Sequence, residues 1–187
     1  MRAKQDRKRK LERVFDPASE SLLLGEKKTE MRWISLLCWL GICFAVAAAG
    51  GRLTASEIPG WYRTLVKPAI APPNWVFGPV WTLLYALMAI AAWRVWLAAP
   101  SPLRAWGLAL FMVQLGLNFA WSRIFFRQHA IGAALVEVVL LWAAIGATTL
   151  VFQRIAPLSA WLMAPYWAWV SFAAVLNAAF WRANRNC

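Results

Sequence analysis

Residues 61–88 read WYRTLVKPAIAPPNWVFGPVWTLLYALM, and this stretch decides the fold. Its first half is a connection stiffened by Pro68, Pro72 and Pro73, because proline fixes φ and biases the preceding residue toward extended backbone. Its second half is an apolar run of the kind that enters a membrane. We expect a rigid aromatic lid beside a membrane-spanning helix. The alternative is a plain connector, although long loops in compact domains are usually functional.

The whole chain has the composition of a membrane protein. Of its 187 residues 61% are hydrophobic, and the mean hydropathy is +0.53. Ten of the 20 Lys and Arg residues and six of the eight acids lie in residues 1–32, and only Glu57 and Glu137 are acidic beyond them. The net charge of +12 therefore belongs to a tail and to the ends of apolar runs. This distribution argues against nucleic-acid binding, which needs a basic face on a folded module.

Five apolar runs approach the roughly 20 residues that a helix needs to cross the hydrocarbon core. Trp and Arg residues lie near the ends of these runs, as is typical of membrane interfaces. We therefore expect an all-α integral membrane protein, a five-helix bundle over residues 33–182. A charged, disordered extension over residues 1–32 precedes it, and a short polar C-terminus, residues 183–187, follows. The predicted spans are residues 33–50, 75–99, 103–121, 130–152 and 158–181. The basic tail favours a cytoplasmic N-terminus, and without the tail this bias reverses.

Aromatic and polar side chains share faces of the predicted helices at spacings of three and four. The stripes are Trp81, Tyr85 and Met88; Gln114, Asn118, Trp121 and Phe125; and Trp169, Ala173, Leu176 and Phe180. Large aromatics on a membrane helix often serve only packing or lipid contact. Gln114 and Asn118, however, cannot sensibly face lipid and should point into the bundle. An interior of this kind suits a flat hydrophobic ring system with a few polar edges.

Isolated polar residues give weaker signals. Glu137 is the sole acid within a predicted span, which makes it either a functional carboxylate or a buried structural partner. His129 lies at a span end, and without a haem attachment motif it is better explained as an interfacial polar residue than as a haem ligand. Cys38 and Cys43 are five residues apart and face different sides of a helix, so we expect no metal site. No constellation of catalytic residues is evident.

Four motifs, in order along residues 33–182, resemble the tryptophan-rich sensory protein family, whose animal members are the translocator proteins or peripheral-type benzodiazepine receptors. They are residues 61–88, QLGLNFAWSRIFF at 114–126, the segment 134–142 around Glu137, and PYWAWVSFAAVLN at 165–177. The resemblance implies a five-helix bundle, often a homodimer, that binds porphyrins such as protoporphyrin IX or haem as ligands and requires no cofactor. The ligand-binding residues that it implies are Trp61, Tyr62, Pro72, Pro73, Trp81, Tyr85, Asn118, Trp121, Trp169, Ala173 and Leu176.

The function implied by the resemblance is a tetrapyrrole-binding sensor or regulator in a bacterial cell membrane. The first alternative is light-dependent porphyrin breakdown, which in some bacterial relatives is linked to the indoles that match Trp81 and Trp169. These two residues are the candidates for catalysis, in a protein that is not a conventional enzyme. The second alternative is transport of porphyrins or other hydrophobic ligands. Animal relatives also carry a sterol motif that requires a tyrosine, and Ala178 stands in its place here, which puts a sterol partner in doubt.

Overall fold

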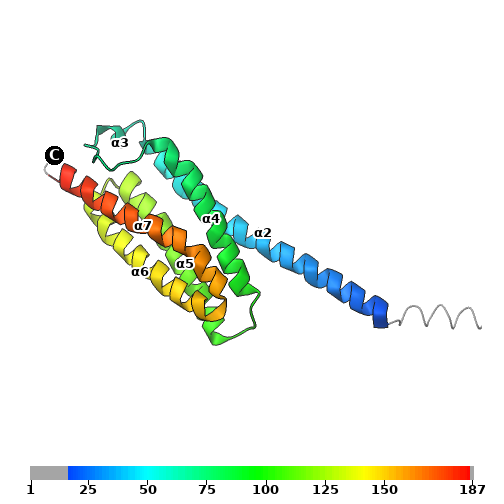
Figure 1. Ribbon diagram of the computed structural model, residues 1–187. Coiled ribbons are helices and arrows are strands. Elements are labelled where there is room, and N and C mark those ends of the chain that lie inside the picture. Colours follow the sequence, from blue (N-terminus) through cyan, green and yellow to red (C-terminus); the bar gives the residue numbers. More distant parts are fainter. Residues whose placement is uncertain (1–16, 186–187) are drawn as a thin grey trace, which may run out of the picture. The chain divides into compact units, whose positions relative to one another are not determined.

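The computed structural model describes residues 17–185 and divides the chain into two units, with the boundary after Leu37. The elements follow in the order α2 (Pro17–Glu57), α3 (Trp61–Thr64), α4 (Asn74–Trp96), α5 (Pro102–Ser122), the π-helical turn η1 (Arg123–Arg127), α6 (Ile131–Ile155) and α7 (Pro157–Asn184). The described residues contain no strand. The second unit, which begins at Cys38, holds the bundle drawn in Figure 1.

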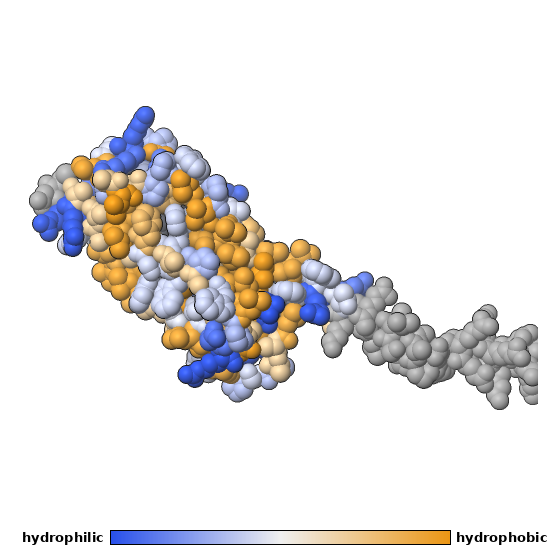
Figure 2. Space-filling model, viewed as in Figure 1, coloured by the Kyte–Doolittle hydropathy of each residue, from blue (hydrophilic) through white to orange (hydrophobic). Residues whose placement is uncertain are grey.

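For the part of the chain that the structure describes, the all-α fold with five membrane-spanning helices is confirmed. The segments long and apolar enough to cross a membrane are Thr29–Glu57, Asn74–Trp96, Pro102–Arg127, Ile131–Ile155 and Pro157–Asn184. Apolar side chains cover most of the visible surface of the bundle, and hydrophilic ones gather mainly at its two ends (Figure 2). This pattern matches a hydrocarbon layer between two aqueous interfaces.

The N-terminal boundary differs from the predicted one. Disorder was expected for residues 1–32, but α2 begins at Pro17, while residues 1–16 lie outside the described part of the chain. Two physical reasons favour the longer helix. Proline is well suited to the first helical position. In addition, residues 18–32 extend a helix that already exists in the membrane span. They therefore avoid the unfavourable free energy of forming a first helical turn.

Local sequence sets several of the other helix ends. Ser101 caps α5, because its hydroxyl oxygen accepts a hydrogen bond from the Arg104 amide at 3.1 Å, and Pro102 occupies the first helical position. The break expected at residues 123–129 is smaller than predicted. The helical path continues through η1, where the Gln128 amide donates to the Arg123 carbonyl at 3.0 Å. This turn keeps Phe125 and Phe126 buried against the bundle.

All five long helices contribute to the main core, and α6 packs most extensively against α5 and α7 (Figure 1). Phe111 of α5 stacks on Phe152 of α6 with ring centroids 6.0 Å apart. A Cβ atom at Gly146 of α6 would lie 3.0 Å from the Trp167 ring of α7, so glycine permits the close approach of these helices. The tight α5–α6–α7 group is the frame on which the remaining helices build a cavity.

Candidate ligand-binding site

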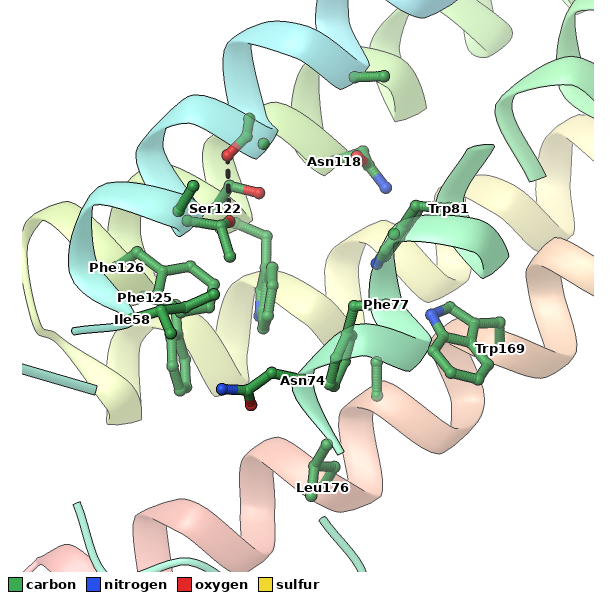
Figure 3. Close-up of a pocket in the computed structure, with 18 of the residues that line it drawn as sticks. Ile58, Asn74, Phe77, Trp81, Asn118, Ser122, Phe125, Phe126, Trp169 and Leu176 are labelled. Atoms are coloured by element: carbon green, nitrogen blue, oxygen red, sulfur yellow. Dashed lines mark hydrogen bonds between the residues drawn. The ribbon is translucent and has the colours of Figure 1, made fainter. Parts of the chain in front are cut away.

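A cavity of about 390 Å³ lies inside the second unit, between α2, α4, α5 and α7. Figure 3 shows side chains of these four helices around one space, among them Trp81, Ser122 and Trp169, together with Ile58, which directly follows α2. Small side chains on α2, including Ala47, Gly50 and Ala55, leave room for the larger aromatics opposite. The volume is within the range of about 300–1,000 Å³ that is usual for small-molecule sites.

Eight of the predicted site residues line this cavity. They are Tyr62, Trp81, Tyr85, Asn118, Trp121, Trp169, Ala173 and Leu176. Trp61, Pro72 and Pro73 are not among the lining residues. Pro73 instead precedes the first residue of α4, and Trp61 turns away to stack on His129 with ring centroids 4.2 Å apart. The geometry thus brings the predicted residues of α4, α5 and α7 together around one cavity, and Tyr62 of α3 joins them from the predicted lid.

A buried hydrogen-bond network forms the inner end of the cavity, which we call the floor. The Tyr85 hydroxyl donates to Asn118 Oδ1, and Asn118 Nδ2 donates to the Tyr166 hydroxyl oxygen at 3.0 Å. The three side chains come from α4, α5 and α7, and each is at most 5% exposed. Both halves of the Asn118 amide are therefore satisfied, and the network joins three helices at one point.

A second polar link ties the cavity wall to α6. Trp121 Nε1 donates to Asn177 Oδ1 at 3.0 Å, and Asn177 Nδ2 donates to the Ile131 carbonyl at 3.0 Å. Asn177 lines the cavity, whereas Tyr166 supports the floor from behind. The sequence-based set omitted both residues. Tyr166 lies three positions before Trp169, so helical spacing could have placed it on the same face.

The aromatic walls retain unused hydrogen-bond donors. Trp81 packs against Tyr85 and Tyr166 at centroid distances of 5.7 and 6.2 Å, and Trp169 lies 6.1 Å from Phe77. Among the side chains described, those of residues 29–185, no hydrogen bond involves the indole N–H of Trp81 or that of Trp169. The cavity therefore offers large π surfaces and free donors to a bound molecule.

The segment from Ile58 to Pro73, which we call the lid, closes one end of the cavity through Ile58 and Tyr62. Tyr62 is 6% exposed and packs against Phe126 and Phe180, each with centroids 5.7 Å away. Burial raises the pKa of its hydroxyl above the ordinary value of 10.0, so the side chain stays neutral at physiological pH.

Two sets of contacts hold the lid, one polar and one aromatic. The Val66 amide donates to Asn184 Oδ1 at 2.9 Å, and Asn184 Nδ2 returns a bond to the Val66 carbonyl at 3.1 Å. In the aromatic set, the Trp61 ring of the lid stacks on His129, whose Nε2 lies 3.1 Å from Glu57 Oε2 at the end of α2. His129 is thus a lid contact, with a positive φ of 56° that local sequence did not suggest.

Two polar side chains inside the bundle stand apart from this site. Gln114 is fully buried, as predicted, and Glu137 is 7% exposed, but neither lines the cavity. Among the described residues, neither side chain has a hydrogen-bond partner. In the same part of the chain, no three His, Cys, Asp or Glu side chains are placed to hold a metal ion.

Comparison with known proteins assigns the chain to a family. Residues 39–182 match the model of the TspO/MBR family. The tryptophan-rich protein TspO of Chlorobaculum tepidum is 39% identical over 155 residues, which cover 81% of this chain and 96% of that protein. The human translocator protein is 41% identical, over 73% of this chain and 82% of its own.

The tryptophan-rich sensory protein of Cereibacter sphaeroides is 36% identical, over 83% of this chain and 95% of that protein. The family match at residues 39–182 includes the lid and at least part of each of the five membrane segments. The chain therefore belongs to the TspO/MBR family and is a multi-pass integral membrane protein.

Proposed function

We propose that this protein is a tetrapyrrole-binding sensor or regulator of the bacterial cell membrane, and that a porphyrin such as protoporphyrin IX occupies the cavity. The observation that carries this proposal is the wall of Trp81, Trp121 and Trp169 around a mostly apolar space. Indole rings provide broad π surfaces that suit a flat macrocycle. The sensory protein of Cereibacter sphaeroides, named as such, supports the regulatory part of the proposal.

Filling the cavity tests the proposal directly. Ala173 lines the cavity on α7, so Ala173→Phe should place a ring in the space that the ligand needs. Purified protein in detergent would be titrated with protoporphyrin IX, and binding followed by porphyrin fluorescence. We expect saturable binding by the wild type and its loss in Ala173→Phe.

Val175 on the same helix supplies a matched control. Its side chain is 61% exposed on the bundle surface, so Val175→Phe adds a ring that does not enter the cavity. This variant should bind as the wild type does. Normal affinity in a folded Ala173→Phe variant would show that the porphyrin binds elsewhere.

Light-dependent porphyrin breakdown is a second candidate function, favoured by the unpaired indole N–H groups of Trp81 and Trp169 on one cavity. An indole can donate an electron to a photo-excited porphyrin. Irradiating the complex and measuring porphyrin absorbance separates this activity from binding alone. Breakdown should require both residues, so unchanged breakdown in a Trp81→Phe, Trp169→Phe double variant would remove this candidate and leave the binding proposal standing.

A further inference from the structure

The cavity has no charged side chain, which limits where an ionised group of a ligand can lie. Every lining residue in the described part of the chain is neutral. Moving an isolated carboxylate into such a space is costly, because nothing there replaces its hydration or neutralises it. A ligand with an apolar body and an ionised edge would therefore place that edge at an end of the cavity where a cation is available.

Lys67 provides such a cation at the lid. Its ammonium nitrogen lies 5.2 Å from the centroid of the Tyr62 ring, and Tyr62 lines the cavity. The lysine side chain is exposed, so its charge retains water while the stem rests on the aromatic ring. An ammonium group in this position can reach the rim of the cavity without being buried.

Among residues 29–185, whose side chains the structure describes, no acid forms an ion pair with Lys67. The ion pairs found there, at 3.1 Å from His129 and 3.9 Å from Arg127, both use Glu57. Lys67 makes neither contact, and its cation–π contact with Tyr62 leaves the ammonium N–H groups open to an anion. The Lys67 ammonium group of the lid thus has no acidic partner among the described side chains.

The backbone around this lysine is held on both sides. Val66, the residue before it, makes the paired hydrogen bonds with Asn184 at the end of α7. Pro68 follows and restricts Lys67 to extended backbone. Figure 1 shows the C-terminal end of α7 on the same side of the bundle as α3 and the lid. The charge is consequently attached at a fixed point beside the cavity rather than on a loose loop.

We propose that Lys67 pairs with an ionised carboxylate at the edge of the bound tetrapyrrole and so selects carboxylated over esterified ligands. The inference rests on the proposed porphyrin binding and assigns the orientation of the ligand: the apolar macrocycle lies between the tryptophans, and the carboxylate edge lies under the lid. The pair is exposed, so its contribution is that of a surface ion pair and decreases as salt is raised.

The experiment compares protoporphyrin IX with its dimethyl ester, which has the same macrocycle without the charges. Affinities of both would be measured by porphyrin fluorescence in neutral detergent for the wild type and for Lys67→Met, which keeps the stem over Tyr62. We expect the wild type to prefer the free acid. Lys67→Met should weaken binding of the acid by about two- to fivefold and leave binding of the ester unchanged.

Two further variants serve as controls. Lys67→Arg keeps a cation and should retain the preference for the acid. Arg94→Met removes an exposed cation near the opposite end of α4 and should also retain it.

The possible failures are distinguishable. Equal loss of acid and ester binding in Lys67→Met would show that the lysine only packs the lid, and an unchanged preference would show that the carboxylates lie elsewhere. Equal wild-type affinity for acid and ester would also overturn the inference, with porphyrin binding left standing. If the wild type bound neither porphyrin, both the proposed function and this inference would be wrong.

Discussion

The floor and the lid enclose the same cavity but are held by different kinds of interaction. At the floor, Tyr85, Asn118 and Tyr166 share hydrogen bonds in a buried region that joins three helices. At the lid, Asn184 and His129 make contacts that water can reach. A buried polar group that loses its partner cannot turn to water, whereas an exposed one can. The floor should therefore be a fixed part of the fold, and the lid a part that can open while the bundle stays intact.

The largest effect should follow disruption of the floor. Asn118→Leu removes both hydrogen bonds and leaves the hydroxyl groups of Tyr85 and Tyr166 without partners. Each orphaned hydroxyl costs about 1–3 kcal/mol in water-soluble proteins, and interhelical hydrogen bonds in membranes average somewhat less. We expect a clear drop in the thermal unfolding midpoint in detergent, with loss of porphyrin binding.

Asn74→Leu is the matched control for that variant. Asn74 also lines the cavity, but its side chain makes no hydrogen bond among the described residues. Its replacement should leave the unfolding midpoint near that of the wild type. If both variants unfolded at the same temperature, the floor network would contribute nothing particular to stability.

A smaller effect is expected from the stiffness of the lid. Pro72→Gly with Pro73→Gly lets the unliganded lid sample more conformations, at about 0.4–1 kcal/mol for each residue. Porphyrin affinity should fall by roughly 1–2 kcal/mol, because binding must then order a looser segment. A fluorescence titration would measure this loss, and the unfolding midpoint of the bundle should change little. Unchanged affinity would show the segment to be only a connector.

The difference between the helical walls and the lid also explains how much of this site could be predicted from the sequence. Wall residues such as Trp81, Tyr85 and Asn118 were predictable because helical spacing places them on shared faces. The residues that hold the lid in place could not be predicted in this way. Val66 and Asn184 are 118 positions apart, and no local periodicity relates them. The stacking of Trp61 on His129 depends on the turn η1, which the sequence suggested only as a break between helices.

The start of α2 was missed for a different reason. Charged residues predict solvent exposure, but exposure does not prevent a helix from continuing out of a membrane span. Sequence reasoning therefore predicted the spans and the cavity walls, because buried residues recur there at the spacing of an α-helix. It did not predict contacts that depend on the path of the chain between helices.

The smallest effect should follow release of the lid at Asn184. Asn184→Ala removes the two hydrogen bonds to Val66 and one from Asn184 Nδ2 to the Phe180 carbonyl at 2.9 Å. Water can replace the lost partners at this partly exposed position, so the net change should be about 0.5–1.5 kcal/mol. We expect porphyrin to associate and dissociate several-fold faster in stopped-flow fluorescence, with an unfolding midpoint close to that of the wild type.

Faster porphyrin exchange in Asn184→Ala would distinguish the lid from the floor most clearly, because it is a change in binding rates without a change in stability. A lid that opens for the ligand should exchange faster when one fastening is removed, since the open state becomes more populated while the walls are unchanged. If Asn184→Ala instead lowered the unfolding midpoint as much as Asn118→Leu does, the lid would be part of the cooperative fold. Access to the cavity would then require a route between the membrane helices rather than opening of residues 58–73.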